Sequence, residues 1–256
     1  MRNTTLSAIF ERMKNAKEYV IFSLGDSITE GARASSDETT YTAVLTRRLA
    51  ERFPARTVLR YDGHSHEGPD SEILPIDRYS DPVSLQNGTE GKLTVVRCGI
   101  GGNSTRRLLR RSADFVGKAF EGRTGDLFLI VVGINDSIEK VPDKFAPPAL
   151  YAEHLHILLD RIEESDPNAD VIFMTPTYYD YGTEPVSRLD PYADAMQTVA
   201  KERSVPVIDL HRLWMEHLVI GGEQYGQGDW LNGDRCHPSD KGHAAIGEEI
   251  ARNLIF

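Results

Sequence analysis

The sequence has little cysteine and no long hydrophobic run, and both shortages limit what the protein can be. Only two cysteines, Cys98 and Cys236, occur in 256 residues. A chain of this length buries enough apolar surface to fold without disulfides, so we expect two reduced thiols. No segment approaches the roughly 18 consecutive apolar residues of a membrane helix. The sequence therefore predicts a protein without a membrane-spanning segment.

Basic residues are also in deficit, and this limits the partners of the protein. The formal net charge is −10 at pH 7. Nucleic acids and anionic membranes attract basic surfaces, so we expect neither as a partner. Residues 1–17 scatter charged side chains among apolar ones and contain no continuous apolar core of a signal peptide. We therefore expect a cytoplasmic protein that acts on small, neutral or cationic molecules.

Short apolar runs bounded by Gly, Asp or Pro alternate with longer amphipathic segments. The alternation is typical of a parallel sheet with helices on both faces, hence an α/β fold in three layers. It predicts one domain over residues 1–256 with a five-stranded sheet. The strands are predicted at 19–24, 92–97, 126–132, 171–175 and 205–208. The helices are predicted at 41–52, 104–112, 148–164, 190–203 and about 240–254, the last with Ser239 as its N-cap.

Residues 60–91 interrupt this alternation. The segment is rich in Gly, Pro, Asp, Ser and His, so we predict a long insertion loop, a kind of loop that is often functional. Pro69, Pro75 and Pro82 oppose the amphipathic helix that a lipase lid would need. We expect the loop to lie over or beside the functional site and to give it a polar alcohol side and a small acyl pocket.

Four short segments carry groups suited to acyl transfer. Three of them directly follow predicted strands, where open α/β sheets bind their ligands: Gly-Asp-Ser-Ile-Thr at 25–29, Gly-Ile-Gly-Gly-Asn-Ser at 99–104 and Gly-Ile-Asn-Asp at 133–136. The fourth, Asp-Arg-Cys-His-Pro at 234–238, precedes the last predicted helix.

Each segment offers a different chemical role. Ser27 follows a sharp exit from a strand and is a candidate nucleophile. The glycines at 99–102 let backbone N–H groups approach a ligand, and the Asn135 carboxamide is a neutral donor for a developing negative charge. Asp234 lies three residues before His237, close enough to fix the tautomer that leaves the other ring nitrogen free to accept a proton.

In order and character, these segments resemble the four signature blocks of the SGNH, or GDSL-like, hydrolases. Ile28 stands where the family name has Leu. The resemblance implies a flavodoxin-like α/β/α fold and a triad of Ser27, His237 and Asp234. It also implies an oxyanion hole made by the backbone N–H groups of Ser27 and Gly102 and the side chain of Asn135, with no metal or cofactor.

The function expected from this resemblance is a serine ester hydrolase. We expect it to release a short acyl group, acetate first, from a polar alcohol such as a carbohydrate. A lysophospholipase or thioesterase using the same triad is the nearest alternative. Two alternatives come from other classes: a non-catalytic binding protein on this fold, and a metal-dependent phosphoesterase.

Three further features have ordinary explanations. His64 and His66 could hold a metal, but no third ligand is evident, so we expect none. Four arginines at 106, 107, 110 and 111 are expected to form a solvated helix edge. The tyrosines at 178, 179 and 181 are equally suited to lining a substrate pocket and to covering the sheet edge.

Overall fold

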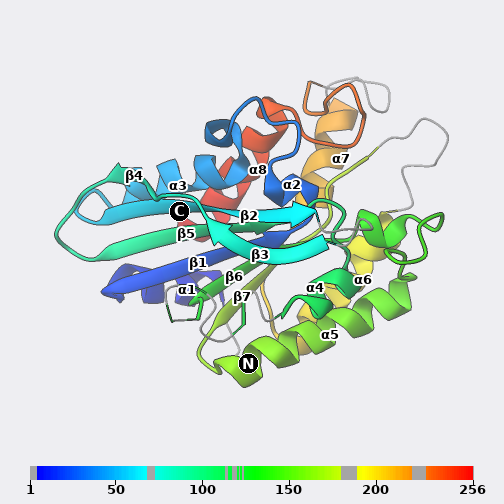
Figure 1. Ribbon diagram of the computed structural model, residues 1–256, viewed down its shortest axis with the longest axis horizontal. Coiled ribbons are helices and arrows are strands. Elements are labelled where there is room, and N and C mark those ends of the chain that lie inside the picture. The colour runs from blue at the N-terminus through cyan, green and yellow to red at the C-terminus, as the bar shows by residue number, and fades with distance from the viewer. Residues whose placement is uncertain are drawn as a thin grey trace.

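A central, mostly parallel β-sheet with helices on both faces forms the molecule (Figure 1). The computed structural model describes residues 5–67, 73–112, 115–116, 120, 122, 124–179, 189–220 and 229–255. Its strands are β1 (Glu18–Gly25), β2 (Thr57–Glu67), β3 (Ile73–Tyr79), β4 (Val83–Gln86), β5 (Lys92–Gly99), β6 (Leu127–Val131), β7 (Asp170–Met174) and β8 (Val207–Ile208). The helices are α1 (Leu6–Asn15), α2 (Ser27–Glu30), α3 (Tyr41–Arg52), α4 (Thr105–Arg110), α5 (Pro148–Ser165), α6 (Asp190–Arg203), α7 (Leu210–Ile220) and α8 (Asp240–Ile255).

The strand order is β3-β2-β5-β1-β6-β7-β8, and β4 also pairs with β2. All neighbours from β2 to β8 run parallel. The five strands predicted from the sequence are β1, β5, β6, β7 and β8. Across the sheet they lie in the order β5-β1-β6-β7-β8, so the second of the five along the chain lies outside the first. This is the flavodoxin order. The strands that follow β1 lie on both of its sides, so the connections run towards opposite edges of the sheet, and a crevice forms between them at the carboxyl end of β1.

The predicted number of strands was too low, and the long insertion loop at 60–91 was wrong. Within the described residues, β2, β3 and β4 add a mixed edge to the sheet, and β3 and β4 run antiparallel to β2. Polar residues, Gly63 and Pro75 interrupt the apolar residues of these strands, so they lack the long apolar runs by which the interior strands were identified. An edge strand keeps one side in contact with solvent, and its sequence pattern is correspondingly weak.

Two hydrophobic cores sandwich the sheet, and alternate residues of its interior strands supply them. Tyr19 and Ile21 of β1 face one core, which includes residues of α1, α3, α7 and α8. Val20, Phe22 and Leu24 face the other, which includes residues of α4, α5 and α6. Figure 1 shows α3, α7 and α8 on the opposite side of the strands from α4, α5 and α6. The predicted three layers are therefore confirmed.

The predicted helices are confirmed within two residues at their ends, and Ser239 caps α8 by accepting from the Gly242 N–H at 3.3 Å. Three helices were not predicted: α1, α2 and α7. α2 has four residues, too few to show a helical period. Arg12 of α1 binds the buried Asp170 of β7 through two hydrogen bonds of 2.6 and 2.7 Å.

Cys98 and Cys236 are buried, and the two side chains are thiols that are not joined in a disulfide. In the part of the chain that the structure describes, no helix is long and apolar enough to cross a bilayer.

Candidate active site

Three of the four segments lie side by side because their strands are neighbours. β1 ends at Gly25, β5 at Gly99 and β6 at Val131, and β1 pairs with both of the others in parallel. Parallel strands end at one edge of the sheet, so residues far apart in the chain meet there. The fourth segment reaches the same edge from the loop before α8, where His237 contacts Ser27.

Ser27 is the first residue of α2, and the preceding residue fixes the start of this helix. The Asp26 carboxylate accepts from the Ile28 N–H at 2.9 Å and caps the helix. Gly99 makes the close approach of this helix to β5 possible, because a Cβ there would come within 2.0 Å of the Glu30 backbone nitrogen. A half-buried serine is thereby held at the crevice.

A continuous hydrogen-bond chain links the nucleophile candidate to a carboxylate. The Ser27 Oγ lies 2.8 Å from the His237 Nε2. The His237 Nδ1 lies 2.8 Å from the Asp234 Oδ2. Such an arrangement lets the imidazole accept the serine proton while the carboxylate orients the ring and stabilises its charged form.

The loop that carries Asp234 and His237 is closed on itself. The Asn232 N–H donates to the His237 carbonyl at 2.9 Å, and Leu231 bridges to Pro238. Arg235 has a left-handed φ of 61°, which lets the chain turn around the Asp234 side chain. This turn aims two backbone N–H groups at one carboxylate oxygen.

The surroundings of Asp234 hold it in the charged form. Partial burial opposes ionisation, but the Oδ1 accepts from the N–H groups of His237 at 3.0 Å and Cys236 at 3.1 Å, and the imidazole binds Oδ2. Together these donors lower the pKa of Asp234 to about 2. Arg33 also donates to Oδ2 at 3.2 Å from the loop after α2.

The other predicted residues, Gly102 and Asn135, lie together beside a buried asparagine. Asn103 is fully buried; its side-chain amide donates to the Gly25 carbonyl at 2.9 Å, and its backbone carbonyl accepts from the Asn135 Nδ2 at 2.9 Å. It therefore ties the ends of β1, β5 and β6 to one another. Gly102 has a φ of 74°, a conformation that favours glycine.

Two buried carboxyl groups, Asp26 and Asp136, lie next to Ser27 and Asn135 in the chain. The pKa of Asp26 is raised to about 6 and that of Asp136 to about 7, in both cases mainly by burial. Asp136 accepts from the Thr105 backbone N–H at 3.0 Å and from the Thr105 hydroxyl. The residue after Asn135 therefore fixes the start of α4 against the end of β6.

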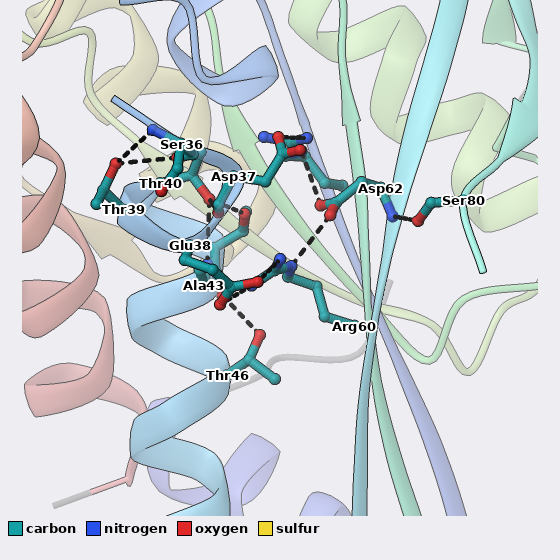
Figure 2. A network of polar contacts seen from close by, with 12 residues as sticks. Ser36, Asp37, Glu38, Thr39, Thr40, Ala43, Thr46, Arg60, Asp62 and Ser80 are labelled. Atoms are coloured by element: carbon teal, nitrogen blue, oxygen red, sulfur yellow. Dashed lines mark hydrogen bonds and ion pairs between the residues drawn. The ribbon is translucent and has the colours of Figure 1, made fainter. Parts of the chain in front are cut away.

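A polar network anchors the loop that follows α2 to the sheet (Figure 2). Arg60 of β2 is buried and binds both carboxylate oxygens of Glu38, at 2.7 and 3.2 Å. Asp62 of the same strand pairs with Arg60 at 3.2 Å and with Arg97 of β5 at 2.9 Å. Arg97 in turn holds Asp37 at 2.6 Å. The unpredicted strand β2 thus helps to fix the loop that carries Arg33.

Sequence reasoning missed three residues of this site: Arg33, Asn103 and Lys144. The Lys144 Nζ donates to the Asn135 Oδ1 at 3.4 Å. Asn103 lies within a segment that was singled out for its glycines alone. The other two stand in polar stretches that show no local pattern, so only the fold reveals them.

The remaining sequence features lie apart from the triad. Arg107 and Arg110 pair with Asp143, but Arg111 is buried and donates to the Cys98 carbonyl, so the solvated edge was wrong for that residue. Tyr178 and Tyr179 are buried against the sheet, which favours the covering role. Tyr181 lies outside the described residues.

Within the described part of the chain, no three His, Cys, Asp or Glu side chains gather as a metal site. The side chains of His64 and His66 fall outside that part, although their backbone belongs to β2.

An α/β sheet that carries a Ser-His-Asp chain at its carboxyl edge defines a serine hydrolase architecture. The chain belongs to the GDSL-like lipase/acylhydrolase family, whose model matches residues 79–245. It is thus a carboxylic ester hydrolase of the SGNH type, and the predicted family is confirmed. The matched range begins after Ser27, which the fold places beside His237. Comparison with curated protein sequences gave no match.

Solved structures share the fold at low sequence identity. An acetyl xylan esterase, AlAXEase, is 18% identical with a TM-score of 0.65, over 92% of this chain and all of that one (100%). Axe2, an acetylxylan esterase from Geobacillus stearothermophilus, is 23% identical with a TM-score of 0.64, over 93% of this chain and 94% of that one. LAE5, described as an alpha/beta hydrolase enzyme from the metagenome of Lake Arreo, is 22% identical with a TM-score of 0.64, over 92% and 94%.

Proposed function

We propose that this esterase cleaves acetyl and other short acyl esters of a polar alcohol such as a carbohydrate, with Ser27 as nucleophile. The observation that carries the proposal is the unbroken chain from the Ser27 Oγ through His237 to Asp234, with both distances at 2.8 Å. A binding protein on this fold has no need of a serine hydroxyl aligned with a carboxylate-oriented imidazole.

In the first step the Ser27 Oγ attacks the ester carbonyl carbon as the His237 Nε2 takes its proton. The carbonyl π bond opens and leaves the negative charge on oxygen. Ser27 begins α2, so its backbone N–H has no partner within the helix and can donate to this oxyanion. The Gly102 N–H and the second amide hydrogen of Asn135 complete the set of donors.

Collapse of the tetrahedral intermediate breaks the bond to the alcohol oxygen. His237 returns its proton to that oxygen, the alcohol departs, and Ser27 holds the acyl group as an ester. Water then attacks the acyl carbon by the same sequence, with His237 as base and then as acid. Free carboxylate leaves, and the Ser27 hydroxyl is regenerated.

The choice of substrate rests on the polarity of the site and on the similar proteins. Within the described residues, Arg33 donates to Asp234 and Lys144 donates to Asn135. Glu30 belongs to the same short helix as Ser27, and charged groups of this kind bind hydroxyls and water well. The two acetylxylan esterases of similar fold act on acetylated carbohydrate according to their names. Both observations favour a small acyl group on a hydroxylated alcohol.

The test is covalent labelling combined with substitution of the nucleophile. A sulfonyl fluoride should add one label, on Ser27, as located by mass spectrometry. Ser27→Ala should lower kcat on nitrophenyl acetate by at least about 10³-fold, since the attacking group is lost. A strong chelator should leave the wild-type rate unchanged, whereas a metal-dependent phosphoesterase would lose it. Undiminished turnover by Ser27→Ala contradicts the proposal.

A further inference from the structure

The carboxamide of Asn135 can act as an oxyanion donor in only one of its two orientations. A half-turn about the last side-chain bond exchanges the NH₂ group, which donates, for the carbonyl oxygen, which repels a negative charge. Whatever fixes this orientation therefore determines whether the donor is in place before substrate binds. Asn103 fixes one end, because its carbonyl accepts from the Asn135 Nδ2 at 2.9 Å.

Lys144 holds the other end of the same amide. Its ammonium donates to the Asn135 Oδ1 at 3.4 Å. A reversed amide would direct two N–H groups at this cation and a lone pair at the Asn103 carbonyl, which is unfavourable at both ends. The second hydrogen on Nδ2 is the one left to donate to substrate.

The ammonium also lies close to the glycine segment. A Cβ at Gly102 would come within 2.8 Å of the Lys144 Nζ, so the cation occupies the space beside that backbone turn. Burial, and then the charge of Arg107, lower the pKa of Lys144. A partly desolvated cation interacts more strongly with a neighbouring amide than one in bulk water.

The loop around Lys144 keeps the lysine at this place. The Lys144 N–H donates to the Val141 carbonyl at 2.9 Å, and the Ala146 N–H donates to the Asp136 carbonyl at 3.0 Å. The Tyr192 hydroxyl of α6 contacts the carbonyls of both Asp136 and Ala146. The loop thus begins and ends at one point next to Asn135, and Lys144 reaches back across it.

We propose that Lys144 is a positioning residue that fixes the Asn135 carboxamide with its free N–H directed at the substrate oxyanion. This inference rests on the proposed function, because it assigns Lys144 to the same oxyanion site. Lys144 acts through Asn135, so its effect should belong to the transition state and should vanish when the amide is absent.

The experiment is a double-mutant cycle on nitrophenyl acetate. Lys144→Met keeps the length of the stem and removes the ammonium; it should lower kcat about tenfold and leave KM within about twofold. Asn135→Ala should lower kcat by about 10²–10³, the usual loss for one side-chain oxyanion donor. In the Asn135→Ala background, Lys144→Met should change kcat less than about twofold, since coupled residues are not additive.

Two variants serve as controls. Lys140→Met removes an exposed lysine from the same loop and should leave kcat and KM unchanged. Lys144→Arg restores a cationic donor and should recover most of the lost kcat. Should Lys144→Met fail to fold, as judged by thermal unfolding, Lys144→Gln serves in its place.

Three results overturn the inference: a Lys144→Met effect confined to KM, a tenfold loss that persists without Asn135, or an unchanged kcat. Ser27→Ala separates these from failure of the proposed function. If Ser27→Ala is inactive while Lys144→Met is fully active, the role of Lys144 alone is wrong. If Ser27→Ala stays active, the proposed function itself is wrong.

Discussion

Asp234 divides its two oxygens between two tasks. Oδ1 accepts from the backbone N–H groups of Cys236 and His237 and so shapes the turn, while Oδ2 faces the His237 ring. Because its pKa lies at about 2, the carboxylate stays ionised at every pH at which a histidine side chain changes its charge. In the proposed mechanism, the orienting carboxylate is therefore charged when the imidazole receives a proton.

Replacing one oxygen of this side chain should separate the two tasks. Asp234→Asn can keep Oδ1 on the backbone donors, so the turn should persist, but its NH₂ group then faces the His237 Nδ1. The ring must accept there and carry its proton on Nε2, where it can no longer take the proton of Ser27. We expect kcat to fall by about 10⁴ in a variant that still folds, with a lowered thermal midpoint because the charged partner of Arg33 and His237 is lost. Steady-state kinetics with a thermal melt checks this, and a fall in KM alone would contradict it.

At the scale of elements, the start of α4 depends on a buried acid from the neighbouring strand end. Asp136 is fully buried and accepts from the backbone N–H and the hydroxyl of Thr105. Burial raises its pKa to about 7, despite those donors. The acid therefore holds a proton in the folded protein at pH values where it has lost it in the unfolded chain.

The stability of the protein should consequently depend on pH through Asp136. Its pKa is about 3.9 when unfolded, so between about pH 4 and 7 the folded state binds more protons and its free energy of unfolding falls as pH rises. Asp136→Asn lacks this contribution. We expect the stability of the variant relative to wild type to increase from pH 5 to pH 8, as measured by urea unfolding.

The control for this measurement is Asp143→Asn. The pKa of Asp143 is lowered, chiefly by its hydrogen bond to Arg107, so it is ionised in both states above pH 5. The difference in free energy of unfolding between Asp143→Asn and wild type should therefore stay constant from pH 5 to pH 8. Burial lowers the pKa of His243 to about 4, so this residue makes the free energy of unfolding rise with pH below about pH 6.5. That contribution is the same in every variant and cancels in the comparison. If the free energy of unfolding of Asp136→Asn relative to wild type were also constant over this pH range, the expected titration of Asp136 would be wrong.

At the scale of the whole molecule, the site lies where the sheet order reverses, and an added polar edge flanks it. β2 contributes the buried Arg60 and Asp62, which hold the loop after α2 through Glu38 and Arg97 (Figure 2). A mixed edge thus occupies much of the segment in which a lipase would need an apolar lid. We therefore expect the acyl side of the substrate to gain little extended apolar surface, as the proposed preference for short acyl groups requires.

The dependence of kcat/KM on acyl chain length tests whether the acyl pocket is small. Each methylene that fits a pocket adds about 0.8 kcal/mol of binding, whereas one that exceeds it adds none and meets polar groups. On nitrophenyl esters with a constant leaving group, we expect kcat/KM to peak between acetate and butyrate and to collapse by laurate. A profile that climbs towards long chains would instead favour the lysophospholipase or thioesterase alternative.

The sequence by itself predicted the interior of the fold and the residues proposed here to react. Interior strands such as β1 and β6 are buried on both faces, so they read as continuous apolar runs. Asp234 and His237 stand three residues apart, within one turn of chain, and Ser27 closely follows the apolar run of β1. Patterns of this kind depend only on neighbouring residues, so they can be recognised without knowing the rest of the fold.

Only the tertiary structure decided the sheet edge and the support of the site. β2 pairs across the sheet through backbone hydrogen bonds, which any sequence can make, so its polar residues gave no signal. Asn103, Lys144 and Arg33 act through partners that the strand order brings close, and nothing adjacent in the chain marks them. Their roles exist because parallel strands end at one edge, where residues distant in sequence become neighbours.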